Sequence, residues 1–279
     1  MNTYIKKINH KKIIFVITLA LLFFAAAFYN GLTVRHYTVK SDKINDERSI
    51  RIVQISDLHS CIYGKNQIYL INKIQSQKPD VIVMTGDIAD DVTPIDGTRM
   101  LISEIVKLAP CYYVSGNHEF WSDDISYIKN VIESYGVEIL EGGLKSITVK
   151  NQKLNICGID DPYVLSSDER NKYAELLIPF KSLSLSELNI LLAHRPEYIE
   201  EYKKYNFDLV FSGHAHGGQW RIPFILNGLY APNQGLFPKY AGGQYNYGSL
   251  THIVSRGLSI NPRLPRIFNP PEIVVIDLK

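Results

Sequence analysis

The segment Asp208-Leu209-Val210-Phe211-Ser212-Gly213-His214-Ala215-His216-Gly217-Gly218 joins an apolar run to two closely spaced histidines. The apolar half is typical of a short buried strand, and the histidines follow where that strand would end. Imidazole suits zinc, iron and manganese, but two neutral imidazoles alone do not hold a cation tightly. The segment is therefore either a glycine-rich turn with two solvated histidines or part of a metal site, and ligands elsewhere in the chain distinguish these interpretations.

Outward from this segment, short apolar strands alternate with helices. The sequence predicts strands at 50–55, 81–84, 111–114, 189–193 and 209–211. Apolar residues at helical spacing predict helices over 65–77 and about 97–108. Strands with continuous apolar runs, separated by helices, indicate a parallel sheet covered on both faces. The polar stretch 32–49 is predicted to be a linker and a first edge strand.

Side chains that can bind metals follow five of these predicted strands. Open α/β sheets carry their sites at the carboxyl ends of the strands, so these side chains are expected to meet at one edge. Singly, the aspartates also fit helix N-caps and His194 a core position, but five of the eight histidines lie at these ends. Seven residues are predicted to bind metal directly: Asp57, His59, Asp87, Asn117, His194, His214 and His216. One zinc takes three or four ligands, so seven indicate two cations, about 3.5–4 Å apart, that share a carboxylate.

The ordered motifs D-x-H, G-D, G-N-H, H and G-H-x-H, spanning Asp57 to His216, resemble those of the calcineurin-like metallophosphoesterase superfamily. The resemblance implies an α/β fold in which two mixed β-sheets form a four-layer α/β/β/α sandwich. It also implies two divalent metal ions, with manganese, iron or zinc expected. By resemblance the first metal is held by Asp57, His59 and His216, the second by Asn117, His194 and His214, and Asp87 bridges them.

The resemblance further implies a metal-dependent phosphoric ester hydrolase, in which hydroxide activated by the metals attacks a phosphodiester, pyrophosphate or phosphomonoester. His118 is predicted to be a general acid that also contacts phosphate. Asp90 matches the position that hydrogen-bonds this histidine in some relatives. Arg221 and Arg256 are predicted to bind substrate phosphate, although both also fit solvated or ion-paired surface positions. The alternative function is a catalytically inactive cell-surface binding module on the same fold.

The first 30 residues are a separate segment. Lys6, Lys7, Lys11 and Lys12 precede an apolar run, Ile13 to Tyr29, that meets the lower length limit for a membrane span. The lysines predict a cytoplasmic N-terminus and a catalytic domain outside the cytoplasm. The alternative is a signal peptide cleaved near Ala25-Ala26-Ala27, which would give a secreted protein. The predicted organisation is a basic segment with its anchor at 1–30, a linker at 31–48 and the phosphoesterase domain at 49–279.

The counts of charged residues and cysteines exclude some classes of partner and of fold. Without the four N-terminal lysines the chain has 26 basic against 28 acidic residues, from totals of 30 and 28, so no nucleic-acid partner is expected. Three cysteines, Cys61, Cys111 and Cys157, predict small buried residues and no disulfide framework. Asp160-Asp161-Pro162 predicts a turn.

The C-terminal third resembles the membrane-associated bacterial branch of the superfamily, which includes exported phosphoesterases and enzymes similar to UDP-2,3-diacylglucosamine hydrolases. The resemblance rests on the segments Gly217–Pro223, Tyr230–Gly235, Val254–Leu258 and Pro270–Ile273. The aromatic-rich stretch from Trp220 to Tyr247 is either a lipid-facing cap or a hairpin packed on the outer sheet. With an anchor nearby, the expected partners are the membrane and a phosphate ester that is lipid- or cell-wall-linked.

Overall fold

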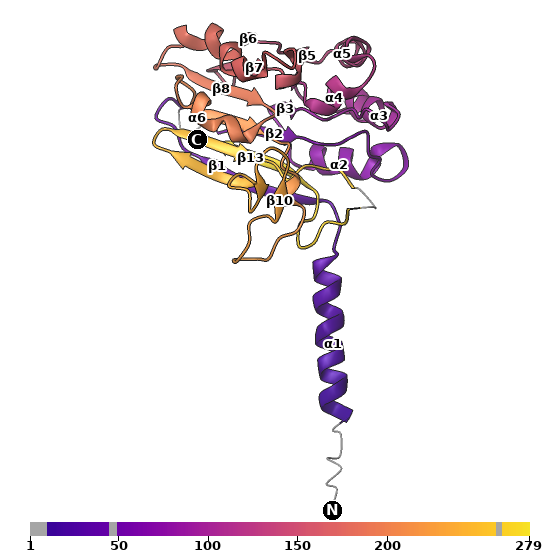
Figure 1. Ribbon diagram of the computed structural model, residues 1–279. Helices are drawn as coiled ribbons and strands as arrows, with labels where there is room; N and C mark the ends of the chain where they lie inside the picture. The colour runs from indigo at the N-terminus through magenta and orange to yellow at the C-terminus, as the bar shows by residue number, and fades with distance from the viewer. Residues whose placement is uncertain (1–9, 45–48, 261–263) are drawn as a thin grey trace, which may run out of the picture.

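A computed structural model describes residues 10–44, 49–260 and 264–279. Two six-stranded mixed sheets form its centre, in the orders β1-β14-β2-β3-β4-β5 and β12-β13-β9-β8-β7-β6 (Figure 1). The first sheet comprises β1 (Thr33–Val39), β14 (Glu272–Leu278), β2 (Ile50–Ile55), β3 (Val81–Thr85), β4 (Cys111–Val114) and β5 (Glu138–Ile139). The second comprises β12 (Gly243–Tyr247), β13 (Leu250–Val254), β9 (Leu209–Ser212), β8 (Leu188–Ala193), β7 (Gln152–Ile159) and β6 (Leu144–Val149).

The strands run as the continuous apolar segments predict, with one addition from the C-terminus. β2, β3, β4 and β5 are parallel to one another. β14 enters the first sheet antiparallel to β2 and parallel to β1, which makes the sheet mixed. β1 forms the edge of this sheet, as expected for the stretch 32–49.

Helices cover the outer face of the first sheet. They are α2 (Ile68–Ser76), α3 (Asp96–Ile105) and α5 (Ile125–Ser134), with the short α4 (Asn117–Trp121) before α5. Their inward faces carry apolar residues three and four apart, such as Leu101, Ile102 and Ile105, all fully buried. The predicted helix over 65–77 begins instead with a 3₁₀ turn, η2 (Lys65–Gln67), because Asn66 and Gln67 adopt left-handed backbone angles.

The inner faces of the two sheets pack on each other and exclude water. This core contains aliphatic and aromatic side chains from both sheets, among them Ile52, Val83, Ile156, Ile190 and Phe211. At about 25 cal/mol for each Å² of apolar surface removed from water, this double-sided burial is a main source of stability. The two sheets therefore hold their strand ends in a fixed relation.

The outer layer of the second sheet differs in detail from an α-helical layer. It consists of the 3₁₀ helix η4 (Arg170–Ser182), short 3₁₀ turns η3 (Pro162–Val164) and η5 (Pro196–Tyr198), and α6 (Ile199–Tyr202). Tyr173, Leu177 and Phe180 of η4 pack on the sheet. Pro179 lies within η4 and lacks the N–H that an α-helix would use. The fold is the predicted four-layer α/β sandwich, with a 3₁₀ element as most of its fourth layer.

The stretch from Trp220 to Tyr247 contains the predicted hairpin strand and, before it, a loop whose contact with lipid stays a prediction. β12 makes an antiparallel hairpin with β13 on the second sheet. The residues before it form a protruding loop that carries the small sheet β10 (Tyr230–Ala231) and β11 (Gly235–Leu236). The three cysteines are unpaired, and Cys111 and Cys157 are buried whereas Cys61 is half-buried.

The N-terminal helix α1 (His10–Ala27) projects away from the domain (Figure 1). Its length and apolar composition suffice to cross a membrane, and 6% of its most apolar window is buried. Contact with the domain occurs at its C-terminal end, where Phe23 lies against Phe268 with ring centroids 5.3 Å apart. The Phe268 N–H donates to the Ala27 carbonyl at 2.7 Å. Lys6 and Lys7, on which the predicted orientation partly rests, lie outside the described residues.

Candidate metal centre

The carboxyl ends of β2, β3, β8 and β9 bring six of the seven predicted ligands into two groups. Within each group, one ligand atom of each residue lies within 4.8 Å of those of the others. Asp57, His59, Asp87 and His216 form the first group, and Asp87, His194 and His214 form the second. Asp87 therefore belongs to both, which is the position that a bridging carboxylate must occupy.

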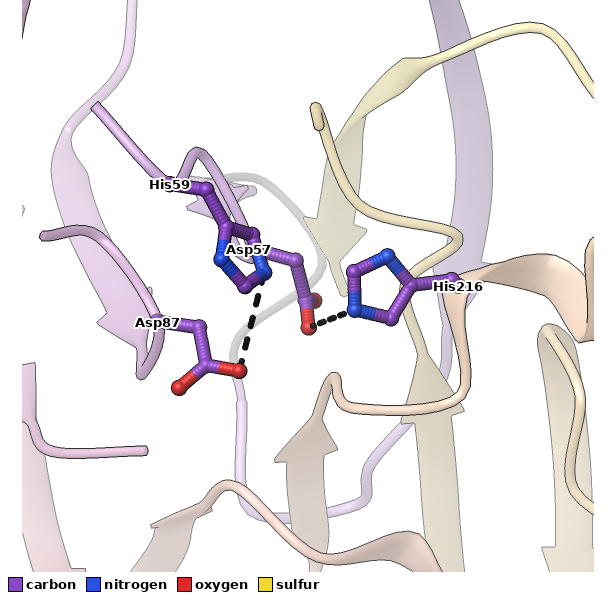
Figure 2. A group of neighbouring side chains, drawn as sticks. All are labelled: Asp57, His59, Asp87 and His216. Carbon is purple, nitrogen blue, oxygen red and sulfur yellow. Dashed lines mark ion pairs between the residues drawn. The ribbon is translucent and has the colours of Figure 1, made fainter. Parts of the chain in front are cut away.

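The first group converges from both sheets (Figure 2). The His59 Nε2 lies 3.7 Å from the Asp87 Oδ2, and the His216 Nε2 lies 3.5 Å from the Asp57 Oδ1. Asp57 and His59 follow β2 and Asp87 follows β3, while His216 comes from the turn after β9. Such spacings leave room for a cation at about 2.0–2.2 Å from each donor.

The second group shares Asp87 with the first. The His194 Nε2 is 3.2 Å from the Asp87 Oδ2, and its ring lies against that of His214 with centroids 4.9 Å apart. The predicted amide ligand, Asn117, is the first residue of α4 and is buried. Its Oδ1 has no hydrogen-bond partner among the described residues.

The buried atoms that lack hydrogen bonds test whether a cation fits here. Buried polar atoms are normally paired, and leaving one unpaired costs about 1–3 kcal/mol. In the described part of the chain, five such atoms belong to predicted ligands: Asp57 Oδ2, His59 Nε2, Asp87 Oδ2, Asn117 Oδ1 and His194 Nε2. Carboxylate, amide and imidazole donors in one pocket suit borderline divalent metals. The residues present fit the two metal ions that the ligand count implies.

Outer contacts fix the orientation of three imidazoles. The Nδ1 of His59 contacts Asp90 Oδ1 at 2.9 Å, that of His194 contacts the Thr85 carbonyl at 2.7 Å, and that of His216 contacts Ser259 Oγ at 2.8 Å. A ring that donates its Nδ1 proton outward turns an unprotonated Nε2 inward, which is the form that binds a metal.

His214 has the reverse orientation. Its Nε2 contacts the Asn233 Oδ1 at 2.9 Å and Arg195 Nη1 at 2.8 Å. Because both outer contacts use Nε2, Nδ1 is the ring nitrogen of His214 that is left to face the ligand group. The two histidines of the G-H-x-H motif thus offer different nitrogens to different groups.

Two residues beside the second group, Arg195 and Asn233, were not among the site residues predicted from the sequence. Arg195 is buried beside His214, and its guanidinium is held by a bidentate ion pair with Asp161. Its position directly after His194 is the only sequence signal. Asn233 lies in the segment Tyr230–Gly235, which had been noted only for its resemblance to one branch of the superfamily. Asp161 also caps η3, in keeping with the predicted turn.

The charges of the buried groups are strongly coupled. Burial opposes a charged imidazole, yet the Asp87 carboxylate raises the pKa of His194 to about 10. Burial likewise opposes ionisation of Asp87, but His194, His59 and His118 hold the pKa of Asp87 well below its ordinary value. Asp87 is therefore an anion in the place where two cations would share it.

Five of the seven predicted ligands adopt left-handed backbone angles that non-glycine residues seldom use. Their φ values are 50° for Asp57, 49° for His59, 51° for Asp87, 64° for His214 and 48° for His216. Each such residue costs about 1–3 kcal/mol, and strain of this kind concentrates at functional sites.

The glycines beside the ligands are required for two different reasons. Gly86 has φ +84°, a left-handed angle that lets the chain turn sharply after β3. Gly116 is required for space instead, because a Cβ there would lie 2.2 Å from the Asp87 Oδ1. A Cβ on Gly213 would lie 1.9 Å from the Ser56 Oγ.

Glu119 braces the loops that carry the ligands. Its buried carboxylate accepts hydrogen bonds from the backbone N–H groups of Asp87, Ile88, Ala89 and Gly116, at 2.7–3.1 Å. Burial and the Asp87 charge raise the pKa of Glu119 to about 7. These contacts give Glu119 a structural role, because it holds the ends of β3 and β4 together.

The two predicted catalytic side chains meet beside the first group. The His118 Nδ1 lies 2.7 Å from Asp91 Oδ1 and 3.2 Å from Asp90 Oδ1. Asp90 lies closer to His59 than to His118, so it supports a predicted metal ligand as well as the predicted acid. Burial lowers the pKa of His118, but Asp90, Asp87 and Asp91 together raise it to about 9. His118 therefore carries a proton at neutral pH.

Arg221 and Arg256 lie elsewhere. Both line a cavity of about 650 Å³ whose described walls include none of the seven predicted ligands. Arg221 donates to the Gly217 carbonyl and to Asn227, and Arg256 lies 3.4 Å from Glu272. A contact between these guanidiniums and the substrate phosphate stays a prediction.

Comparisons with known proteins identify the family of the chain. The family model for calcineurin-like phosphoesterases matches residues 50–218. The Bacillus subtilis protein named uncharacterized metallophosphoesterase YkuE is 33% identical over 254 residues, covering 87% of this chain and 84% of the relative. The Chlamydia muridarum UDP-2,3-diacylglucosamine pyrophosphatase LpxG is 27% identical over 281 residues, covering 81% of this chain and 83% of the relative. Among solved structures, a dimetal phosphatase from Danio rerio is 12% identical with a TM-score of 0.47, covering 82% of this chain and 92% of that one.

The chain belongs to the calcineurin-like phosphoesterase family. It is a metal-dependent phosphoric ester hydrolase, and members of this family typically bind two divalent metals.

Proposed function

We propose that the chain is a membrane-anchored di-metal phosphoesterase that hydrolyses a phosphodiester, pyrophosphate or phosphomonoester of a membrane- or cell-wall-associated substrate. The observation that carries this proposal is the shared position of Asp87. Its Oδ2 is buried, has no hydrogen bond among the described residues, and lies between the two ligand groups.

In this proposal Asp57, His59 and His216 hold one cation, Asn117, His194 and His214 hold the other, and Asp87 bridges them. When bound, two divalent cations neutralise phosphate oxygens and lower the pKa of water toward about 7. The strained backbone and the outer contacts of the imidazoles pre-organise these ligands, which reduces the cost of arranging them around the metals.

His118 supplies the proton in this mechanism. Asp91 and Asp90 hold its Nδ1, so Nε2 is the nitrogen left to face the substrate. Its raised pKa of about 9 keeps the imidazole protonated at neutral pH. His118 can therefore donate from Nε2 to the leaving oxygen as the bond to phosphorus breaks.

The membrane part of the proposal rests on α1. Its apolar surface is almost entirely exposed, which is stable only in an apolar surrounding. We place the domain outside the cytoplasm, as the N-terminal lysines predict, with secretion after signal cleavage as the alternative. The names of two relatives support a membrane setting: the Chlamydia muridarum pyrophosphatase acts on a diacylated nucleotide sugar, and a Danio rerio relative is a transmembrane protein with a metallophosphoesterase domain.

The proposal is tested with the full-length chain purified in detergent. After chelation the protein is reloaded separately with manganese, iron or zinc, and bound metal is counted by mass spectrometry. Hydrolysis of a soluble diester, a soluble monoester and UDP-2,3-diacylglucosamine is then measured for the wild type and for Asp87→Asn. We expect two metals and turnover in the wild type, and loss of both in the variant. Two bound metals without hydrolysis of any ester would instead identify an inactive binding module.

A further inference from the structure

The foot of the domain combines apolar and cationic surface next to the end of α1. We use "the foot" for the turn Ile222–Leu226 and the adjoining cavity of about 650 Å³, which Arg35, Arg221, Arg256 and Phe268 also line. In Figure 1 the protruding loop that follows β9 lies at the lower end of the domain, beside the upper end of α1. The described walls of the foot include none of the seven predicted metal ligands, and its exposed apolar turn has no role in the proposed phosphoesterase mechanism.

The apolar part of the foot is a tight turn with bulky side chains at its tip. Phe224 is fully exposed and Ile225 is 82% exposed. Ile222 and Leu226 close the turn with a pair of backbone hydrogen bonds of 3.0 and 2.8 Å. Phe224 has φ 67°, an angle that is costly for an aromatic residue. A strained turn that holds a phenyl ring in water is difficult to explain as packing, and such exposed apolar tips mark binding surfaces.

The cationic part is an excess of guanidinium over carboxylate. Arg35 and Arg256 share one buried carboxylate, Glu272, at 3.8 and 3.4 Å. Arg221 donates to Asn227 and to a backbone carbonyl, neither of which neutralises it. Three positive charges thus face one negative charge. Burial and the neighbouring Arg256 lower the pKa of Arg221 to about 10, so Arg221 still carries its charge at neutral pH.

The arginine cluster and the exposed apolar turn of the foot together match an anionic phospholipid. Guanidinium binds phosphate through paired, charge-assisted hydrogen bonds. Apolar side chains beside such a cluster suit the boundary between lipid headgroups and acyl chains. A free phosphate would use the arginines but not the phenyl ring, whereas an anionic phospholipid uses both.

The end of α1 places the foot at the right height for a lipid surface. Phe268, which lines the cavity, packs on Phe23 and donates its N–H to the carbonyl of Ala27, the last residue of α1. β1 begins at Thr33, and Arg35 is its third residue. A bilayer that surrounds α1 therefore ends beside the foot.

We propose that the foot is a membrane-docking surface, in which Phe224 and Ile225 enter the headgroup region while Arg35, Arg221 and Arg256 bind the phosphate of an anionic phospholipid. This inference rests on the proposed membrane anchor and goes beyond the phosphoesterase activity. Docking gives the domain a second point of attachment, which restricts its rotation about the end of α1 and fixes the direction in which the metal centre faces.

The test uses the full-length chain in nanodiscs of phosphatidylcholine, with or without phosphatidylglycerol. The chain has two tryptophans, and Trp220 lies two residues before the turn with 41% of its side chain exposed. In a Trp121→Phe background, bromine atoms on the acyl chains quench Trp220 only when it approaches the bilayer. We expect quenching that is stronger with phosphatidylglycerol, and at least about a twofold loss in a Phe224→Ser/Ile225→Ser variant.

Matched variants separate docking from general effects. Leu185→Ser removes an exposed apolar side chain outside the foot, and Arg99→Gln removes a charge from α3; neither is expected to change quenching. Arg221→Gln/Arg256→Gln is expected to abolish the added effect of phosphatidylglycerol. Absence of Trp220 quenching in protein that is retained in the nanodiscs would overturn the inference.

Two further outcomes distinguish this inference from the proposed function. If the chain leaves the nanodiscs, the anchor fails and the docking surface fails with it. If Arg221→Gln/Arg256→Gln raises the KM for a soluble ester in detergent while quenching is unchanged, the arginines bind substrate and docking is refuted. Loss of ester hydrolysis alone contradicts only the phosphoesterase mechanism.

Discussion

At the scale of single residues, Asp87 is the reason why we propose two metal positions that share one ligand. Its carboxylate is the group that the two clusters have in common. His214 and His216, although two residues apart, lie in different clusters and offer different nitrogens. The turn between them therefore separates the two metal positions.

This separation predicts selective metal loss. His216→Ala should weaken the first position and His214→Ala the second, while each variant keeps most of its affinity for the other metal. Removing one ligand typically costs more than the 10- to 100-fold that outer contacts contribute. Stepwise titration of chelated protein with manganese, followed by metal counting, measures both positions. Loss of the same single metal in both variants would contradict two separate positions.

Asp90 and Asp91 provide a sharper test of the predicted acid. Because Asp90 contacts both His59 and His118, Asp90→Asn should lower turnover by about 10- to 100-fold and also weaken the first metal position. Asp91 contacts His118 alone of these two histidines, so Asp91→Asn should lower turnover and leave metal binding intact. Rates are compared at saturating metal. Equal metal loss in both variants would indicate that neither aspartate acts through His118.

At the scale of secondary-structure elements, strands β3 and β4 determine how closely the loops that follow them approach each other. The ends of β3 and β4 come so near that the backbone of Gly116 almost contacts the Asp87 carboxylate. Gly116→Ala should displace Asp87 and reduce metal affinity at both positions by at least about tenfold, because both share this ligand. Gly143→Ala is the matched control, since an added Cβ there meets open space. Metal binding that is equal in the two variants would show that the loop yields easily.

Within the second sheet, β13 contains a buried histidine outside the metal site. Burial lowers the pKa of His252 from 6.5 to about 3, and its Nε2 contacts Ser212 Oγ at 3.0 Å. Between these two values the unfolded chain binds a proton that the folded chain does not. Stability therefore falls by about 1.4 kcal/mol for each pH unit below about 6.5, which amounts to about 2 kcal/mol near pH 5.

His252→Gln keeps a hydrogen-bonding group but cannot titrate. We expect its free energy of unfolding, measured by urea denaturation of chelated protein in detergent, to lose about 2 kcal/mol less than that of the wild type between about pH 7 and about pH 5. His36→Gln, at an exposed position in β1, serves as the control. An identical acid response in the wild type and His252→Gln would mean that protonated His252 is accommodated.

At the scale of the whole molecule, α1 and the domain meet at one small contact. Ala27 is buried against the domain, so cleavage near Ala25-Ala26-Ala27 would remove the helix that Phe268 contacts. We therefore expect the mature chain to retain α1 and to expose its domain outside the cytoplasm. Intact mass and protease accessibility in whole cells measure these properties. A mature chain that begins after Ala27, or a domain protected from external protease, would contradict the anchor or its orientation.

The sequence determined most of the fold and of the ligand set. Continuous apolar strands, each followed by a potential ligand, predicted that Asp57, Asp87 and His194 lie at the strand ends where the structure has them, because a buried strand ends where its polar residues begin. His252 does not follow any of the predicted strands, and the structure places it within β13, away from the strand ends. The glycines at positions 86, 116 and 213 are visible in the sequence, but the tight contacts that exclude a Cβ at Gly116 and Gly213 exist only in the folded chain.

Only the tertiary structure decided which side chains face each other across the two sheets. Asp87 belongs to both ligand groups, and the ring of His214 turns its Nε2 toward Arg195. Both features depend on contacts between the ends of β3, β8 and β9, and these contacts cannot be predicted from any local sequence pattern. β14 joins the first sheet from the far end of the chain for the same reason. Local sequence specifies the elements through their burial pattern, whereas the packing of one sheet on the other specifies the geometry of the metal centre.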